Sequence, residues 1–118
     1  MKKPERRIKP VRIKVRRARR GGRVKAVTDQ KRVEICYGKR QELLWEATDG
    51  DLVIHFSRKD SPWHAGRYIF HVEQGDSVGS GVPLKAAARK EPYVYQMWLI
   101  EPVTGALLPV DPSVIIKG

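Results

Sequence analysis

The sequence predicts an all-β fold, an antiparallel β-sandwich that carries an extended basic arm at its N-terminus. Along most of the chain, Gly, Pro or Asp separates short runs in which apolar and polar residues alternate, and this spacing is typical of sandwiches. Charge is the second observation. Residues 1–26 hold thirteen Lys or Arg and a single acid, whereas residues 27–118 hold eleven basic and twelve acidic residues. We therefore expect a nearly neutral sandwich, 27–118, after a basic arm, 1–26, that is largely disordered when free.

The arm contains one strand-like pattern. Residues 1–10 include two prolines and show no periodicity, so we expect them to be extended and mobile. Val11, Ile13 and Val15 then alternate with cations, which indicates a short strand that pairs only when an anion neutralises its charges. Gly21-Gly22 predicts a turn.

The body that follows is predicted to consist of short strands joined by turns. In chain order these strands are 24–27, 33–37, 43–47, 52–57, 68–73, 93–100, 106–110 and 114–116. Asp49-Gly50 and Thr104-Gly105 are expected to close hairpins. Residues 74–91 are less regular, and within them 84–90 is expected to form about two helical turns or a loop.

The run Tyr93–Ile100 is predicted to be the central strand. Prolines bound it on both sides, and Gln96 is its one clearly polar residue. Because both faces of the run are largely apolar, we expect the strand to be covered on both sides.

A series of packing and turn residues recurs along the body: Trp45, Asp49-Gly50, Leu52-x-Ile54-x-Phe56, Ser61-Pro62, Tyr93-x-Tyr95 and Asp111-Pro112-x-Val114-Ile115-Ile116. Their order resembles that of small bacterial cupredoxin-like β-sandwich domains that lack copper. The resemblance covers about residues 27–118 and implies a cupredoxin-like or immunoglobulin-like fold, but no catalytic role. In copper-binding cupredoxins the Cys, the second His and the Met lie close together near the C-terminus, whereas here Cys36 precedes all three histidines. We therefore do not expect electron transfer.

The histidines and the cysteine are the other candidate chemical groups. His55, His64 and His71 would bind Zn²⁺ or Ni²⁺ if they clustered, but no carboxylate or cysteine at ligand spacing accompanies them. Cys36 lies in a strand-like run, where a small buried thiol is more common than a nucleophile. The sequence therefore predicts no enzyme activity, no metal and no cofactor.

Cellular location follows from what the sequence lacks. Its single cysteine excludes an internal disulfide, which fits a reducing compartment. The N-terminus has no apolar run of the kind that a secretory signal needs. We therefore expect a cytoplasmic protein.

The cations of the arm are the candidate binding site. Arginine pairs bidentately with phosphate, and a membrane-surface segment would carry the bulky apolar anchors that this arm lacks. The sequence therefore predicts a non-enzymatic protein that binds the nucleic-acid backbone, with RNA favoured over DNA because Arg-rich disordered segments fold on RNA. No membrane partner is expected. The predicted contacts are Arg6, Arg7, Lys9, Arg12, Lys14, Arg16, Arg17, Arg19, Arg20, Arg23 and Lys25.

Other functions stay open at this point. In one, the body is a cupredoxin-like protein-interaction module, an exposed sheet edge takes a partner strand, and the arm binds an acidic protein surface. In another, the chain is a small enzyme or metal binder built around Cys36 and the histidines. The arm is also open to interpretation as a tail that only increases solubility.

Overall fold

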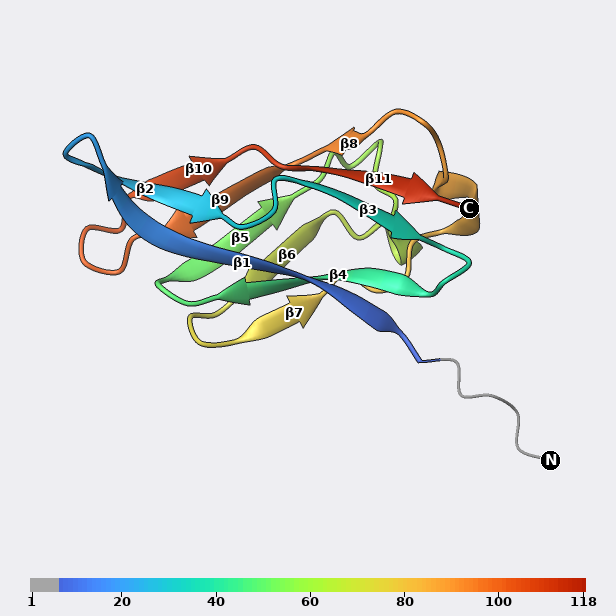
Figure 1. Ribbon diagram of the computed structural model, residues 1–118, viewed down its shortest axis with the longest axis horizontal. Helices are drawn as coiled ribbons and strands as arrows, with labels where there is room; N and C mark the ends of the chain where they lie inside the picture. Colours follow the sequence, from blue (N-terminus) through green and yellow to red (C-terminus); the bar gives the residue numbers. More distant parts are fainter. Residues whose placement is uncertain (1–6) are drawn as a thin grey trace.

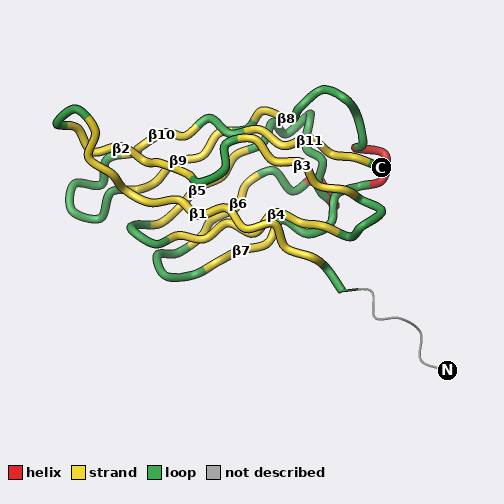
Figure 2. The backbone as a smooth tube through the Cα atoms, in the orientation of Figure 1, coloured by secondary structure: helices red, strands yellow, loops and turns green. Residues whose placement is uncertain are grey.

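A computed structural model of the chain describes residues 7–118 (Figure 1). Within this range the chain forms eleven strands and two short 3₁₀ helices, and the strands build three sheets that pack around one core. Figure 2 shows strands through most of the described chain, with helix confined to short segments. The predicted all-β sandwich is therefore confirmed. In the same range, no helix has the length and apolar character needed to cross a bilayer.

The eleven strands divide among the three sheets as follows. The first sheet has the order β2-β1-β4-β7 and contains β1 (Lys9–Arg20), β2 (Arg23–Thr28), β4 (Gln41–Ala47) and β7 (Ser77–Gly79). The second has the order β10-β9-β5-β6 and contains β5 (Asp51–His55), β6 (Ile69–Val72), β9 (Gln96–Ile100) and β10 (Leu107–Val110). The third has the order β3-β11-β8 and contains β3 (Arg32–Cys36), β8 (Tyr93–Val94) and β11 (Ser113–Lys117).

Antiparallel pairing predominates, but two pairings are parallel. β1 pairs in parallel with β4, and β11 pairs in parallel with β3. A parallel pair needs a crossover connection, and for β1 and β4 the chain makes it through β2 and β3. The sequence predicted antiparallel strands only, because local turn signals carry no information about such long-range pairings.

Five aromatic side chains form the centre of the core. The Trp45 ring lies 4.9 to 6.5 Å, centroid to centroid, from the rings of Phe56, Trp63, Phe70 and Tyr95. The Trp45 Nε1 donates a hydrogen bond to the Tyr95 hydroxyl at 3.3 Å, and burial raises the pKa of Tyr95 to about 12. Each such ring pair adds about 0.5–1.5 kcal/mol beyond area burial.

The predicted boundary between a disordered arm and a folded body differs from the structure. Residues 9–20 form β1, which pairs with β4 from Lys9–Gln41 to Val15–Ala47, and the side chains of Ile13 and Val15 are 0% exposed. Burying each side chain contributes about 1.5–3 kcal/mol, while the alternate cations point to the opposite side, where water and salt screen their repulsion. The structure therefore places this strand in the sandwich. The predictions for residues 1–6 lie outside the described residues.

The expectation of one doubly covered central strand over 93–100 is wrong. β8 and β9 lie in different sheets, and Tyr95 separates them. Only the odd-numbered residues of the run are buried, whereas Val94 is 70% exposed and Trp98 is half-buried. The even-numbered face is largely apolar but only partly covered, which is why the pattern was misleading.

The two predicted hairpin signals have different outcomes. Thr104-Gly105 lies between β9 and β10, which form an antiparallel pair, as predicted. Asp49-Gly50 instead connects β4 of the first sheet to β5 of the second, so its hairpin prediction is wrong. A Cβ on Gly50 would lie 2.3 Å from the carbonyl oxygen of Ile100, so glycine allows the connection to pass close to β9. Residues 84–90 form a loop with the single 3₁₀ turn η2 (Lys85–Ala87).

Candidate nucleic-acid interface

The end of β1 and the start of β2 form a two-stranded hairpin. The pairing of β1 with β4 stops at Val15, whereas its pairing with β2 continues from Val15 to Arg20. Gly21 and Gly22 have φ angles of +60° and +76°, the conformation of the type I′ turn that matches strand twist in two-residue hairpins. The predicted turn is therefore confirmed, and Figure 1 shows it at one end of the molecule. We call residues 16–25 the cationic hairpin.

The cationic hairpin carries six Lys or Arg and no acid. All six residues are exposed, and strand alternation divides them between the two faces of the hairpin. Arg16, Arg20, Arg23 and Lys25 lie on the outer face, and Arg17 and Arg19 lie on the face that Ile13 and Val15 share. Among the residues that the structure describes, Arg17 is the only one of the six with an acidic partner. Five positive charges are therefore left uncompensated on one short ordered element.

Arg17 anchors the base of the hairpin to the body. Its backbone N–H donates to Asp49 Oδ2 at 2.7 Å, and its Nη1 donates to Glu101 Oε1 at 2.6 Å. The hydroxyl of Thr48, the residue before Asp49, donates to the carbonyl oxygen of Val15 at 3.0 Å. These bonds fix the direction in which the hairpin leaves the sheet.

Glu101 is the acidic centre of this anchor. The residue is only 7% exposed, and its second oxygen, Oε2, accepts hydrogen bonds from Thr104 N, Thr104 Oγ1 and Val103 N at 2.6, 2.8 and 3.1 Å. The bonds from Thr104, followed by that from Val103 and the charge of Arg17, lower the pKa of Glu101. The sequence analysis does not single out Glu101, which directly follows the predicted strand 93–100. The available signal was an acid directly before a Pro-x-Thr-Gly turn.

Carboxylates on the neighbouring strand β4 offset part of the positive charge in the first half of β1. Arg12 pairs with Glu46 of β4, and Glu42 lies opposite Pro10 on the same neighbouring strand. The side chains of Lys9 and Lys14 have no acidic partner within residues 7–118. Lys14 lies opposite Glu46 on β4, and its backbone N–H donates to Asp29 Oδ1 at 3.0 Å. Of the other predicted contacts, Arg7 is described at the very start of the structure, and Arg6 lies outside the described residues. The structure thus concentrates the predicted site in the cationic hairpin.

His55 and His71 lie on the paired strands β5 and β6, two positions apart, whereas His64 and Cys36 lie on other elements. His71 Nε2 lies 3.3 Å from Asp51 Oδ2, the His55 ring packs 5.8 Å from the Tyr68 ring, and His64 begins η1 (His64–Gly66). Cys36 lies on β3, in a different sheet from His55 and His71, and its thiol contacts the Gly118 carbonyl oxygen at 3.0 Å. Over the described range 7–118, no group of three His, Cys, Asp or Glu side chains is arranged to hold a metal ion.

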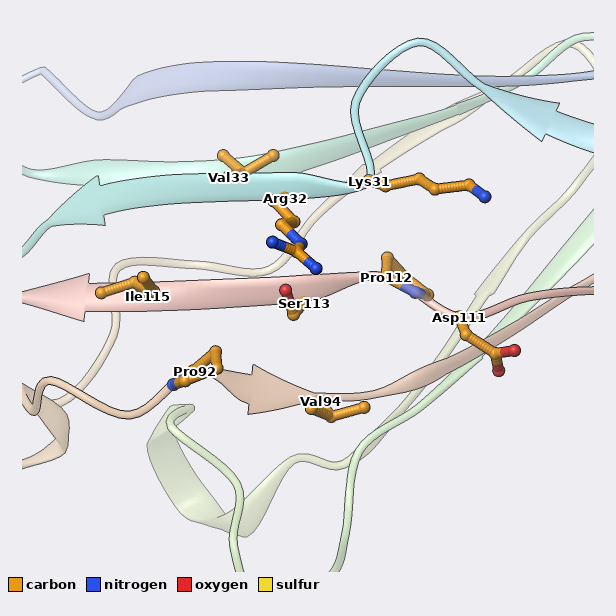
Figure 3. Close-up of a pocket in the computed structure, with 9 residues that line it drawn as sticks. All are labelled: Lys31, Arg32, Val33, Pro92, Val94, Asp111, Pro112, Ser113 and Ile115. Atoms are coloured by element: carbon orange, nitrogen blue, oxygen red, sulfur yellow. The ribbon is translucent and has the colours of Figure 1, made fainter.

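A hollow of about 450 Å³ lies over the third sheet (Figure 3). Its lining includes Lys31, Arg32, Asp111 and Ser113. The Arg32 guanidinium points toward Ser113, while the Asp111 carboxylate points away from the other labelled side chains. Because two cations share this hollow with one carboxylate, it offers a polyanion much less charge than the cationic hairpin does.

Comparisons with known proteins leave this site to be interpreted from its own geometry. No protein-family model matches the chain, and a search of curated proteins gave no match. The cupredoxin-like resemblance therefore stays a prediction.

Proposed function

We propose that the protein is a non-enzymatic nucleic-acid-binding protein that contacts the phosphate backbone through its cationic hairpin. The observation that carries this proposal is the set of five exposed cations, Arg16, Arg19, Arg20, Arg23 and Lys25, that have no acidic partner within residues 7–118. Like charges at this density repel one another, and a polyanion relieves that repulsion while it releases its own counterions.

The cationic hairpin is already ordered, and this favours binding. A disordered arm loses about 1–2 kcal/mol of backbone entropy for each residue that it orders on its ligand. Residues 16–25 are already held by the β1–β2 pairing and by the bonds of Arg17, so binding does not require this loss. The guanidinium groups of four free arginines are also suited to bidentate phosphate contacts.

The proposal is tested with two variants that lose equal charge. Arg19, Arg20 and Arg23 are changed to Gln in one variant, and the exposed Lys59, Lys85 and Lys90 are changed to Gln in the control. Binding of the full chain to labelled DNA and RNA is measured by fluorescence anisotropy between about 50 and 200 mM salt. Five phosphate contacts on duplex DNA predict a log–log salt slope of about −4.5, and removing three predicts a slope nearer −2.

The control variant distinguishes binding through the hairpin from a general effect of net charge. We expect the control variant to keep the affinity and salt slope of the native chain, because its three lysines lie outside the hairpin. Equal losses in the two variants would show that only net charge matters and would refute the hairpin as the site. Polyglutamate is added as a competitor. If it displaced nucleic acid at equal charge concentration, an acidic protein surface would be the better partner.

A further inference from the structure

The shape of the cationic hairpin narrows the class of nucleic acid that it fits. From the Ala18–Lys25 pair outward, every residue except Ala18 is exposed, and a Cβ on Gly21 or Gly22 would meet nothing within 4 Å. Three residue rises separate this pair from the turn, so the tip extends about 10 Å at ~3.4 Å per residue. The exposed tip is thus a narrow, preformed ribbon of two strands.

The charges of the tip lie on both of its faces. Arg20, Arg23 and Lys25 point to the outer face, and Arg19 points to the opposite face. An element that lies flat on one strand needs cations on one face only, whereas an element inside a groove has a phosphate backbone on each side. The distribution therefore favours insertion into a groove over binding along a surface.

The dimensions of the ribbon distinguish among grooves. Its two backbones are about 4.8 Å apart, and the major groove of B-form DNA, about 12 Å wide and 8.5 Å deep, admits a two-stranded ribbon. The minor groove, at about 6 Å, leaves no space for side chains on both faces of a ribbon. The major groove of A-form RNA is deep but too narrow for side chains to reach the bases.

Single strands fit the tip less well for a chemical reason. Proteins that bind single strands add aromatic side chains on which bases stack, at about 1–3 kcal/mol for each base. Residues 16–25 contain no aromatic residue. The sequence favoured RNA because disordered arginine-rich segments fold on RNA. That reason does not apply to residues that the structure places in paired strands.

We propose that the tip of the cationic hairpin, residues 18–25, enters the major groove of B-form duplex DNA. This inference rests on the proposed nucleic-acid-binding function and names its substrate class. The glycine turn, which carries no side chains, faces the floor of the groove. Arg20 and Arg23 lie opposite each other in the strand register, directly beside the turn. They are placed to reach guanine edges or the flanking phosphates.

The test uses the full chain and three labelled probes of one sequence: a DNA duplex, its single strand, and the matching RNA duplex. We expect the DNA duplex to bind about tenfold or more tightly than either other probe, a difference of about 1.4 kcal/mol or more. Two modified conditions locate the groove. Glucosylated hydroxymethylcytosine, which fills the major groove, is expected to weaken binding about tenfold, while netropsin in the minor groove leaves it within about twofold.

The outcomes separate this inference from the proposed function. Equal affinity for the DNA and RNA duplexes, or binding unaffected by glucosylation, would overturn the major-groove inference while nucleic-acid binding stands. Failure of all three probes to bind at low salt would refute both. The variant Arg20→Gln/Arg23→Gln is expected to lose most of the preference for duplex DNA. The control Lys85→Gln/Lys90→Gln is expected to keep it, and an unchanged preference in the first variant would also overturn the inference.

Discussion

Truncating Ile13 tests directly whether the basic N-terminal segment is part of the folded core. Ile13 is 0% exposed in β1, between Arg12 and Lys14. Changing it to Ala removes three carbon atoms from the core, or about 2.4 kcal/mol of transfer free energy at ~0.8 kcal/mol per carbon. The cavity left behind adds to this value, so we expect the free energy of unfolding to fall by about 2–5 kcal/mol.

Urea denaturation followed by tryptophan fluorescence measures this loss, because Trp45 and Trp63 lie in the core. With a slope of about 1–2 kcal/mol per molar urea, the midpoint should fall by at least about 1 M. The matched control is Ile8→Ala, just before β1, where the side chain is 43% exposed and the expected change is within about 0.5 kcal/mol. If Ile13→Ala were as stable as the native chain, β1 would not be a core strand, and the segment would be a detachable arm after all.

The remaining predictions concern the anchor, a close backbone approach and the core hydrogen bond. Glu101→Gln should loosen the hairpin, seen as faster amide exchange over 17–25 and weaker nucleic-acid binding, because Arg17 loses its charged partner. Because hydrogen bonds from Thr104 lower the pKa of Glu101 below its ordinary 4.5, the carboxylate stabilises the native fold above that pH, and the effect disappears as acid protonates it. Gly50→Ala should destabilise the fold by about 1–3 kcal/mol, measured by thermal unfolding, because its Cβ would collide with backbone. Spectrophotometric titration should show one tyrosine with a pKa of about 12, and stability should fall as pH rises above 10 because unfolded Tyr95 ionises first.

Each of these predictions has its own control and contrary result. Gly38→Ala is the control for Gly50, because the nearest atom to its added Cβ lies at an ordinary 3.6 Å, and equal melting of the two variants would contradict the close approach. Unchanged exchange over the hairpin in Glu101→Gln would show that the pairing of Arg17 with Glu101 does not anchor it. Tyr95→Phe should remove the high-pKa tyrosine from the titration. If that tyrosine persists, the assignment of the buried hydroxyl is wrong.

Local signals predicted the local structure. Alternation located most strands to within one or two residues, and the Gly21-Gly22 and Thr104-Gly105 turns lie where the glycines indicated. Asp49-Gly50 failed as a hairpin signal because turn chemistry shows that the chain reverses but not which sheet it enters next. The same limit explains the missed parallel pairing of β1 with β4, which are separated in the chain by β2 and β3.

The candidate site was predictable in composition but not in form. The sequence shows the cations of the segment and the alternation of Ile13 and Val15. It does not show that burial of these two side chains outweighs the repulsion among the cations and keeps the segment in the sheet. The pairing of Arg17 with Glu101 joins residues 84 positions apart and has no local signature. Which cations are neutralised, as Arg12 is by Glu46, likewise depends on a sheet pairing that only the fold reveals.

The parallel pairing of β1 has a consequence for the order in which the molecule is assembled. The hairpin of β1 and β2 is local and can close within about 1–10 μs of leaving the ribosome, but Lys9 must wait for Gln41, and Arg17 for Glu101, to be synthesised. We therefore expect chains arrested before Glu101 to offer their basic ribbon to polyanions while the inner surface of β1 is still bare. Protease digestion of such arrested chains, with and without added DNA, would show whether the ligand can act as a temporary partner during synthesis.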